Sequence, residues 1–167
     1  MAKKKLPKKI VSKEIEEVQI RANHKEIKIL GLVAKDIKAN KNILHMNPYV
    51  ALKYYKSDWQ CFSEWEKQEL CEFSTFLKSL QNHTWQQVYD TGGRIPKHGL
   101  AYTKYGINDI KSNAIKERLK SVKDEISEDI NFFELRVNQN KLRVHGFQSQ
   151  SAFFLVALDR NHEAFPM

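Results

Sequence analysis

The C-terminal third of the chain constrains the fold most, because three consecutive segments there carry strand patterns. Residues 132–139 and 141–148 alternate apolar and polar side chains over most of their length, and residues 152–159 are apolar up to Leu158. Alternation is typical of a strand with one buried face, whereas a short continuous apolar run is typical of a strand covered on both faces. The order predicts an antiparallel meander of three strands, with the last strand central and most buried.

The turn between the first two strands determines which side chains face each other. A two-residue or four-residue turn sets Arg136 opposite Arg143 and Glu134 opposite His145. A slip of one residue would turn the apolar side chains to the wrong face. Two arginines directly across a ladder repel each other. The pair therefore calls for an anion, either Glu134 or a ligand such as a phosphate.

The charge and the cysteines narrow the class of protein. The 167 residues carry 28 Lys and Arg against 20 Asp and Glu, which gives a net charge of +8 and a pI of about 9.4. Such a balance favours an acidic partner, with nucleic acid first and an anionic membrane or an acidic protein second. Cys61 and Cys71 form no C-x-x-C motif, so the sequence predicts neither a disulfide framework nor a zinc site. We expect both to be buried thiols in a reducing compartment.

The N-terminus is basic but is not followed by an apolar run, so it does not resemble a secretory signal. No apolar stretch approaches the roughly 20 residues that span a membrane. These features predict a soluble, cytoplasmic protein without a membrane partner. The lysine-rich residues 1–13 are expected to form either a flexible arm along phosphates or a solubilising tail.

Helix and strand signals fill the rest of the chain. Apolar residues at helical spacing favour a helix over residues 25–39, and an aromatic run favours a strand over residues 49–55. A capping box formed by Ser63 and Glu66 predicts the start of the clearest helix.

A second box, formed by Thr84 and Gln87, predicts a short helix that Gly92 and Gly93 end. Residues 91–106 are expected to be a loop, and Asn108 or Asp109 to cap one more helix.

Three short segments and the order of elements resemble the RelE/HigB group of bacterial toxins. The segments are residues 134–137, 142–144 and 161–165, and the resemblance extends over about residues 49–90 and 132–166. It implies a RelE-like α+β fold, with an N-terminal helical region and strand, two helices, and a C-terminal antiparallel three-stranded meander. Residues 1–45 would then be a basic arm and helical extension, and residues 46–167 the RelE-like domain with an insertion at about 91–131.

These toxins are small, basic, metal-independent ribonucleases that cut mRNA, often in the ribosome, and an antitoxin silences them. The resemblance therefore implies RNA and an acidic antitoxin as partners, and no cofactor or metal. Carried over by position, Arg136 and Arg143 would clamp the phosphate, with Lys141 as a supporting cation. His145 and His162 would be the acid and base candidates.

Other readings of the same residues remain open. This chain has Phe165 where the family often has a tyrosine or histidine, and a phenylalanine cannot transfer a proton. That departure favours a non-catalytic module that binds nucleic acid or an acidic protein; a structural or interaction protein is a third reading. Arg136 and Arg143 could also be a solvated strand face. In the predicted loop the candidates for RNA contact are Arg94, Lys97, His98, Tyr102 and Lys104. Tyr102 and Tyr105 are the aromatic side chains that could stack on RNA, although packing is the favoured alternative for both.

Overall fold

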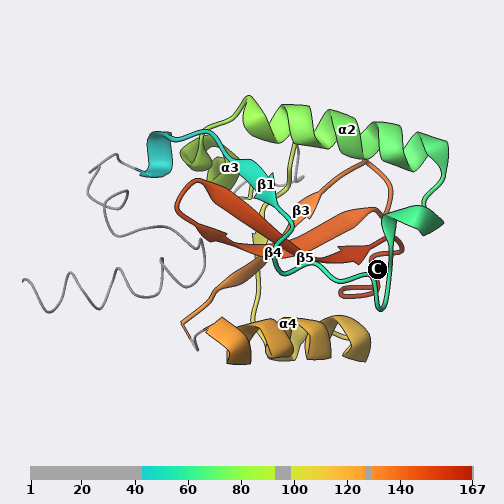
Figure 1. Cartoon of the computed structure of the whole chain (residues 1–167). Helices are drawn as coiled ribbons and strands as arrows, with labels where there is room; N and C mark the ends of the chain where they lie inside the picture. The colour runs from blue at the N-terminus through green and yellow to red at the C-terminus, as the bar shows by residue number, and fades with distance from the viewer. Residues whose placement is uncertain (1–42, 93–98, 127–128, 167) are drawn as a thin grey trace, which may run out of the picture. The chain divides into compact units, whose positions relative to one another are not determined.

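The computed structural model describes residues 43–92, 99–126 and 129–166. In these residues five strands form one mixed sheet, with helices on both of its faces (Figure 1). The predicted helix over residues 25–39 lies outside the described residues. The strands are β1 (Tyr49–Ala51), β2 (Thr103–Lys104), β3 (Phe132–Arg136), β4 (Arg143–Ser149) and β5 (Ala152–Asp159), and the helices are α2 (Lys67–Gln81), α3 (Trp85–Asp90) and α4 (Asn113–Ile126).

The structure confirms the α+β class and the antiparallel meander β3-β4-β5, with β3 ending three residues earlier and β4 beginning two residues later than predicted. The predicted register is also confirmed, since Arg136 pairs with Arg143 and Glu134 with His145. All eight residues of β5 are buried.

The expectation that the last strand is central was wrong. The strand order is β1-β5-β4-β3-β2, which places β4 in the middle. β1, the short edge strand that the aromatic run predicted in a longer form, pairs in parallel with β5. β2, which lies within the predicted loop and pairs with β3, was missed by the sequence analysis. Its two residues are too few to show the period of a strand.

The starts of two helices also differ from the prediction, for the same physical reason. Residues 62–64 form a single 3-10 turn, and α2 begins only at Lys67, where the N–H of Glu66 donates to the carboxylate of Glu69 at 2.8 Å. Between the turn and the helix, Trp65 is extended and only 6 % exposed. The chain leaves the helical conformation there because the indole is drawn into the core.

The second case is the predicted cap at Asn108 or Asp109. Residues 107–109 form a 3-10 turn, Ile110 is extended and buried, and α4 begins at Asn113. The capping box of Thr84 and Gln87, by contrast, forms as predicted and opens α3.

Each face of the sheet has its own apolar layer. Leu135 and Val144 join the core cluster that also contains Phe76 and Leu80 of α2 and Trp85 of α3. α4 lies on the opposite face (Figure 1) and buries Ile115, Leu119 and Val122. Because neighbouring side chains along a strand point to opposite faces, the polar residues that alternate with Leu135 and Val144 point to the α4 side. They therefore do not form an open sheet surface.

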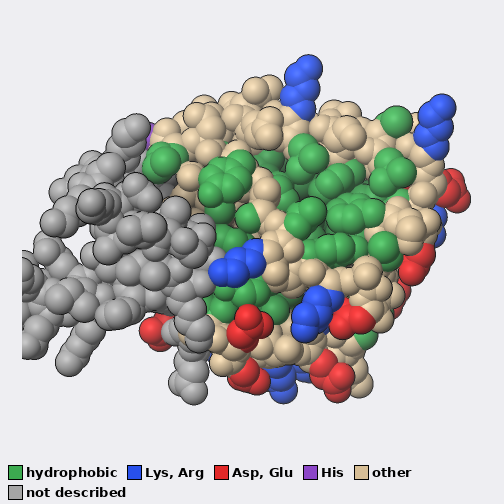
Figure 2. Space-filling model, in the orientation of Figure 1, with side chains coloured by type: hydrophobic (Ala, Val, Ile, Leu, Met, Phe, Trp, Pro, Cys, Tyr) green, Lys and Arg blue, Asp and Glu red, His purple; other side chains and the backbone are tan. Residues whose placement is uncertain are grey.

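Figure 2 shows hydrophobic side chains gathered on the face that carries β1 and α2. The large apolar residues that remain exposed in the described part are Leu44, Tyr49, Leu52 and Leu70.

The cysteines differ from the expectation of buried thiols. Cys61 is half-buried and Cys71 is exposed on α2, and both are free.

Gly146 provides a test of the packing between β4 and β5. A Cβ at this position would collide with the backbone carbonyl oxygen of Phe154 and would lie 2.8 Å from a ring carbon of Phe153. Since a backbone atom of a fully buried strand cannot move aside, Gly146→Ala should lower the free energy of unfolding by about 3 kcal/mol in urea denaturation.

Gly106→Ala is the matched control, because its Cβ would meet only the side-chain carboxylate of Asp109, at 3.0 Å. We expect a loss of less than about 1 kcal/mol there. Equal losses for the two variants would contradict the tight approach of β4 to β5.

Candidate functional site

Polar side chains gather on the α4 side of the sheet, where β3, β4 and β5 lie side by side. Across the strands Arg136 faces Arg143, and Arg143 faces Asp159 at the end of β5. The next row contains Glu134 and His145. Two residues outside the strands complete the group, which we call the polar cluster: Tyr105, Glu134, Arg136, Arg143, His145, Asp159 and His162.

The deepest part of the polar cluster is the pair of His145 and Asp159, and neither side chain is exposed to solvent. The Nδ1 atom of His145 lies 2.8 Å from the hydroxyl oxygen of Tyr105, and Nε2 lies 3.4 Å from Oδ2 of Asp159. The Asp159 carboxylate also accepts the backbone N–H groups of Glu163 at 2.7 Å and Ala164 at 2.9 Å. His145 is therefore engaged on both ring nitrogens inside the protein, in a position that orients its neighbours and does not reach a ligand.

The surroundings fix the protonation states of the two partners of His145. Burial raises the pKa of Tyr105 well above its ordinary value, and the carboxylates of Glu134 and Asp159 raise it further. Burial alone would also raise the pKa of Asp159, but the hydrogen bonds from His145 and from the N–H groups of Ala164 and Glu163 hold it below the ordinary value. A His145 ring that accepts a hydrogen bond at Nδ1 and donates one from Nε2 satisfies both partners.

A second contact joins Glu134 of β3 to His162, which follows β5. The Oε2 atom of Glu134 lies 3.4 Å from Nε2 of His162, and the two side chains are 8 % and 13 % exposed. Within the described residues, Oε2 of Glu134 and both ring nitrogens of His162 are buried and make no hydrogen bond. His162 also has a φ of 58°, in the left-handed region that ordinary residues seldom adopt. Buried polar atoms that lack hydrogen bonds, in a strained backbone, are typical of functional sites.

The two arginines are half-buried, and each uses one Nη group on the β3–β4 turn. Nη1 of Arg143 donates to the carbonyl oxygens of Asn138 at 3.3 Å and Leu142 at 3.0 Å, and Nη1 of Arg136 donates to Oε1 of Gln139 at 3.0 Å. Arg143 is therefore not simply part of a solvated strand face, which was the alternative reading of the pair.

The repulsion expected between the two arginines is partly offset inside the protein. The pKa of the Arg143 guanidinium is lowered, mainly by burial and also by the charge of Arg136. The carboxylates of Glu134 and Asp159 raise it and so oppose this shift. Two arginines thus lie near two carboxylates. Glu134 therefore provides part of the negative charge that the sequence predicted beside the arginine pair.

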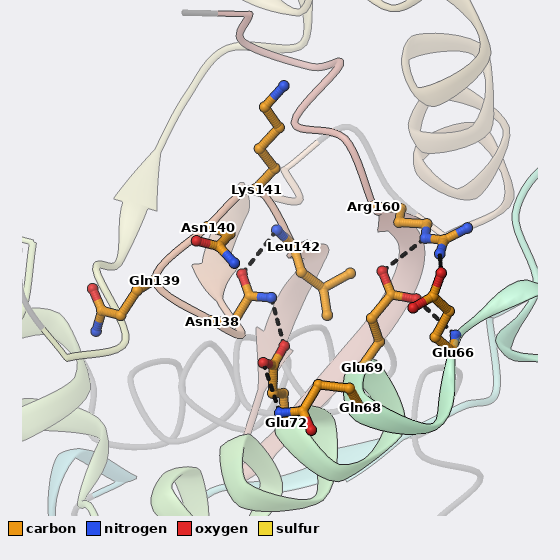
Figure 3. Close-up of a pocket in the computed structure, with 10 residues that line it drawn as sticks. All are labelled: Glu66, Gln68, Glu69, Glu72, Asn138, Gln139, Asn140, Lys141, Leu142 and Arg160. Carbon is orange, nitrogen blue, oxygen red and sulfur yellow. Dashed lines mark hydrogen bonds and ion pairs between the residues drawn. The ribbon is translucent and has the colours of Figure 1, made fainter.

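Lys141 lies elsewhere, at the mouth of a groove of about 620 Å³ between α2 and the β3–β4 turn (Figure 3). The α2 wall of this groove carries Glu66, Glu69 and Glu72, and the Lys141 side chain points away from them (Figure 3). Arg160 also lines the groove, with its Nε 2.7 Å from Glu69. A wall of carboxylates repels phosphate, so the groove does not extend the polar cluster as an RNA-binding surface.

The remaining candidates are placed as follows. Lys104 is exposed on the edge strand β2. Tyr102 packs its ring against Tyr89 and Phe133, with centroids 4.9 and 4.8 Å apart, so packing accounts for it. Arg94, Lys97 and His98 lie outside the described residues.

The structure thus brings together Arg136, Arg143, His145 and His162 of the predicted residues, and adds Asp159 and Tyr105. Sequence reasoning missed Asp159, although it had a signal as an acidic residue at the end of an otherwise apolar strand. Tyr105 was considered only as a side chain that could stack on RNA, and the structure places its hydroxyl against His145 instead.

Among residues 43–92, 99–126 and 129–166, no three His, Cys, Asp or Glu side chains are grouped so that they could hold a metal ion. In the same part of the chain no helix is both long enough and apolar enough to cross a membrane. Compared with protein-family models, with curated proteins and with solved structures, the chain matches none. The likeness to RelE/HigB toxins therefore rests on the short segments of the sequence described above.

The lowered pKa of Asp159 leads to a test by pH. A carboxylate whose pKa is lower in the folded than in the unfolded state stabilises the fold above the unfolded pKa, and this contribution is lost as the pH falls through the folded pKa. At pH 7, Asp159→Asn should lower the free energy of unfolding by about 2 kcal/mol, because charge-assisted hydrogen bonds are lost. The difference from the wild type should shrink as the pH falls below about 3.8.

The measurement is urea denaturation between pH 2 and 7. Asp90→Asn is the control, because Asp90 is exposed on α3 and should stay within about 0.5 kcal/mol of the wild type. A difference between Asp159→Asn and the wild type that stays constant over this pH range would contradict the role given to the carboxylate.

Proposed function

We propose that this protein is a metal-independent endoribonuclease of the kind found in bacterial toxin–antitoxin systems, and that it acts on RNA at the polar cluster. The observation that carries the proposal is the position of Arg136 and Arg143 on the same sheet face as the Glu134–His162 contact, whose buried atoms lack hydrogen bonds. Cations that bind a phosphate and a nearby histidine are what phosphodiester cleavage needs in the absence of a metal.

In this proposal the arginines hold the scissile phosphate. Each guanidinium carries five N–H donors in a planar fork, which can serve the turn and a phosphate together. The 2′-hydroxyl oxygen attacks the adjacent phosphorus, and the bond from phosphorus to the leaving 5′ oxygen breaks. The products are a 2′,3′-cyclic phosphate and a 5′-hydroxyl end, while the arginines stabilise the charge that develops on the phosphoryl oxygens.

In this proposal the ring of His162, whose side chain is 13 % exposed, turns a nitrogen toward the bound RNA and takes the proton of the attacking 2′-hydroxyl. Solvent supplies a proton to the leaving oxygen. Glu134, 3.4 Å from the His162 ring, balances the positive charge that the ring acquires. Asp159 acts indirectly, since its carboxylate holds the N–H groups of Glu163 and Ala164 directly after His162. His145, whose other ring nitrogen contacts Tyr105, holds Asp159, so we assign His145 a positioning role in place of the acid or base role that the resemblance implies.

The same proposal includes the partners and the location. A net charge of +8 favours RNA and an acidic antitoxin, and we propose a cytoplasmic protein. The acidic groove along α2 is a poor surface for either partner, so both are expected to approach from other sides of the sheet.

A second candidate is a module of the same fold that binds nucleic acid or an acidic protein without cleaving it. Two observations favour it. Phe165, whose ring centroid lies 6.4 Å from that of His162, cannot transfer a proton, and one Nη group of each arginine is committed to the turn.

Replacing His162 separates the two candidates. His162→Gln should lower the rate of RNA cleavage in the presence of a chelator at least about 100-fold, because general base catalysis is lost, and should change RNA affinity less than about twofold. His45→Gln is the control, since His45 is exposed far along the sequence from the polar cluster. The cleaved ends are analysed for the cyclic phosphate. A wild-type protein that binds RNA and never cleaves it would establish the second candidate.

The arginines are tested through salt dependence. Arg143→Ala should weaken RNA binding and lower the slope of log K against log salt by about 0.7 for each phosphate of a single strand that the protein no longer neutralises. Lys78→Ala, on the exposed side of α2, should change neither. Because Arg143 also donates to the turn, the free energy of unfolding is measured in parallel. RNA binding that is unaffected by Arg143→Ala would assign the arginine pair to the turn alone.

A further inference from the structure

A second cavity, of about 430 Å³, opens on the α4 side of the sheet, and the mechanism above does not use it. Its walls come from the segment 105–108, from α4 and from the start of β3. Its volume lies within the range of about 300–1,000 Å³ that small-ligand sites occupy in proteins. Three features of the lining indicate what kind of ligand it fits.

The first feature is a mainly polar lining that also includes two apolar side chains. Ile130 and Phe132 line the cavity and are almost fully buried. Asn108 and Asn131 line it too and are exposed, so their amides are able to donate and accept hydrogen bonds at the rim. Amides that can donate and accept hydrogen bonds beside apolar side chains suit a nucleobase, which combines an apolar ring with polar groups around its edge.

The second feature is the charge contributed by α4. Lys120 and Lys123 line the cavity, and they can meet the phosphate of a nucleotide. Asp124 lines it as well, and its carboxylate can accept a hydrogen bond from an exocyclic amino group. Adenine, cytosine and guanine carry such a group, whereas uracil does not.

The third feature is the link to the polar cluster. Tyr105 lines the cavity, and its hydroxyl oxygen lies 2.8 Å from Nδ1 of His145. Phe132 and Arg136 lie on the same face of β3, four residues apart, which corresponds to about 13 Å along the strand. A single-stranded RNA of a few nucleotides spans this distance.

We propose that this cavity binds the base of a nucleotide that lies a short way along the strand from the scissile phosphate, and that it favours bases with an amino group over uracil. The proposal rests on the proposed function, because it takes RNA as the ligand and the polar cluster as the place of cleavage. Residues 91–131 have no counterpart in the toxin resemblance, and they supply the segment 105–108 and α4, so the base preference is a property of this chain.

The experiment measures binding of fluorescent oligomers of adenosine, cytidine and uridine, about eight nucleotides long, by anisotropy. The full-length wild type should bind the adenosine and cytidine oligomers more tightly than the uridine oligomer. Asn131→Ala should weaken binding of the adenosine oligomer about tenfold without changing the salt slope, and Asp124→Asn should reduce the difference between bases. Lys123→Ala should weaken all three oligomers and lower the slope. Lys116→Ala, on α4 but outside the lining, should match the wild type.

The outcomes distinguish the two proposals. Arg143→Ala could weaken binding of all three oligomers while Asn131→Ala and Lys123→Ala leave it unchanged. That result would overturn the proposal that the cavity binds a base, and the proposed function would stand. If the wild type binds no RNA, the proposed function fails. Binding of adenosine monophosphate then tests the cavity by itself. Binding that Asn131→Ala abolishes would support the proposed base site, and an absence of binding would overturn it.

Discussion

The burial of β5 on both faces is the constraint on which the rest of the structure depends. A strand with eight buried residues and no polar face requires a cover on each side. α2 and α3 supply one cover and α4 supplies the other, while β1 and β4 occupy the two edges of the strand (Figure 1). In a two-layer fold the polar face of β3 and β4 would be open to solvent; here α4 lies on that side, and the polar residues are largely enclosed.

Enclosing polar groups is costly unless they are paired, and the polar cluster shows both situations. His145 lies between Tyr105 and Asp159, and the carboxylate of Asp159 holds two backbone N–H groups. Glu134 and His162 are less completely satisfied, since they lie 3.4 Å apart with buried atoms that make no hydrogen bond in the described residues. The contrast separates the residues that stabilise the site from those proposed to act on a ligand.

The surface charge is divided between the two sides of the sheet. The groove on the α2 side (Figure 3) is lined by three glutamates and by Lys141 and Arg160. The second cavity, on the α4 side, is lined by two lysines and by Asp124, and it adjoins Tyr105. A protein with a net charge of +8 thus has one locally acidic wall, which orients an anionic ligand toward the α4 side. Both proposals place RNA there.

The sequence by itself determined the α+β class, the β3-β4-β5 meander, the pairing of Arg136 with Arg143 and the cap of α3. These follow from local rules, since strand register depends on a period of two and on the length of one turn, and a capping box lies within four residues. Only the tertiary structure decided that β4 is central, that α2 and α4 begin after a 3-10 turn, and that His145 is buried. Those features depend on contacts between distant segments, because a polar residue on a strand is exposed or enclosed according to what packs over it, and α4 lies well before β4 in the sequence.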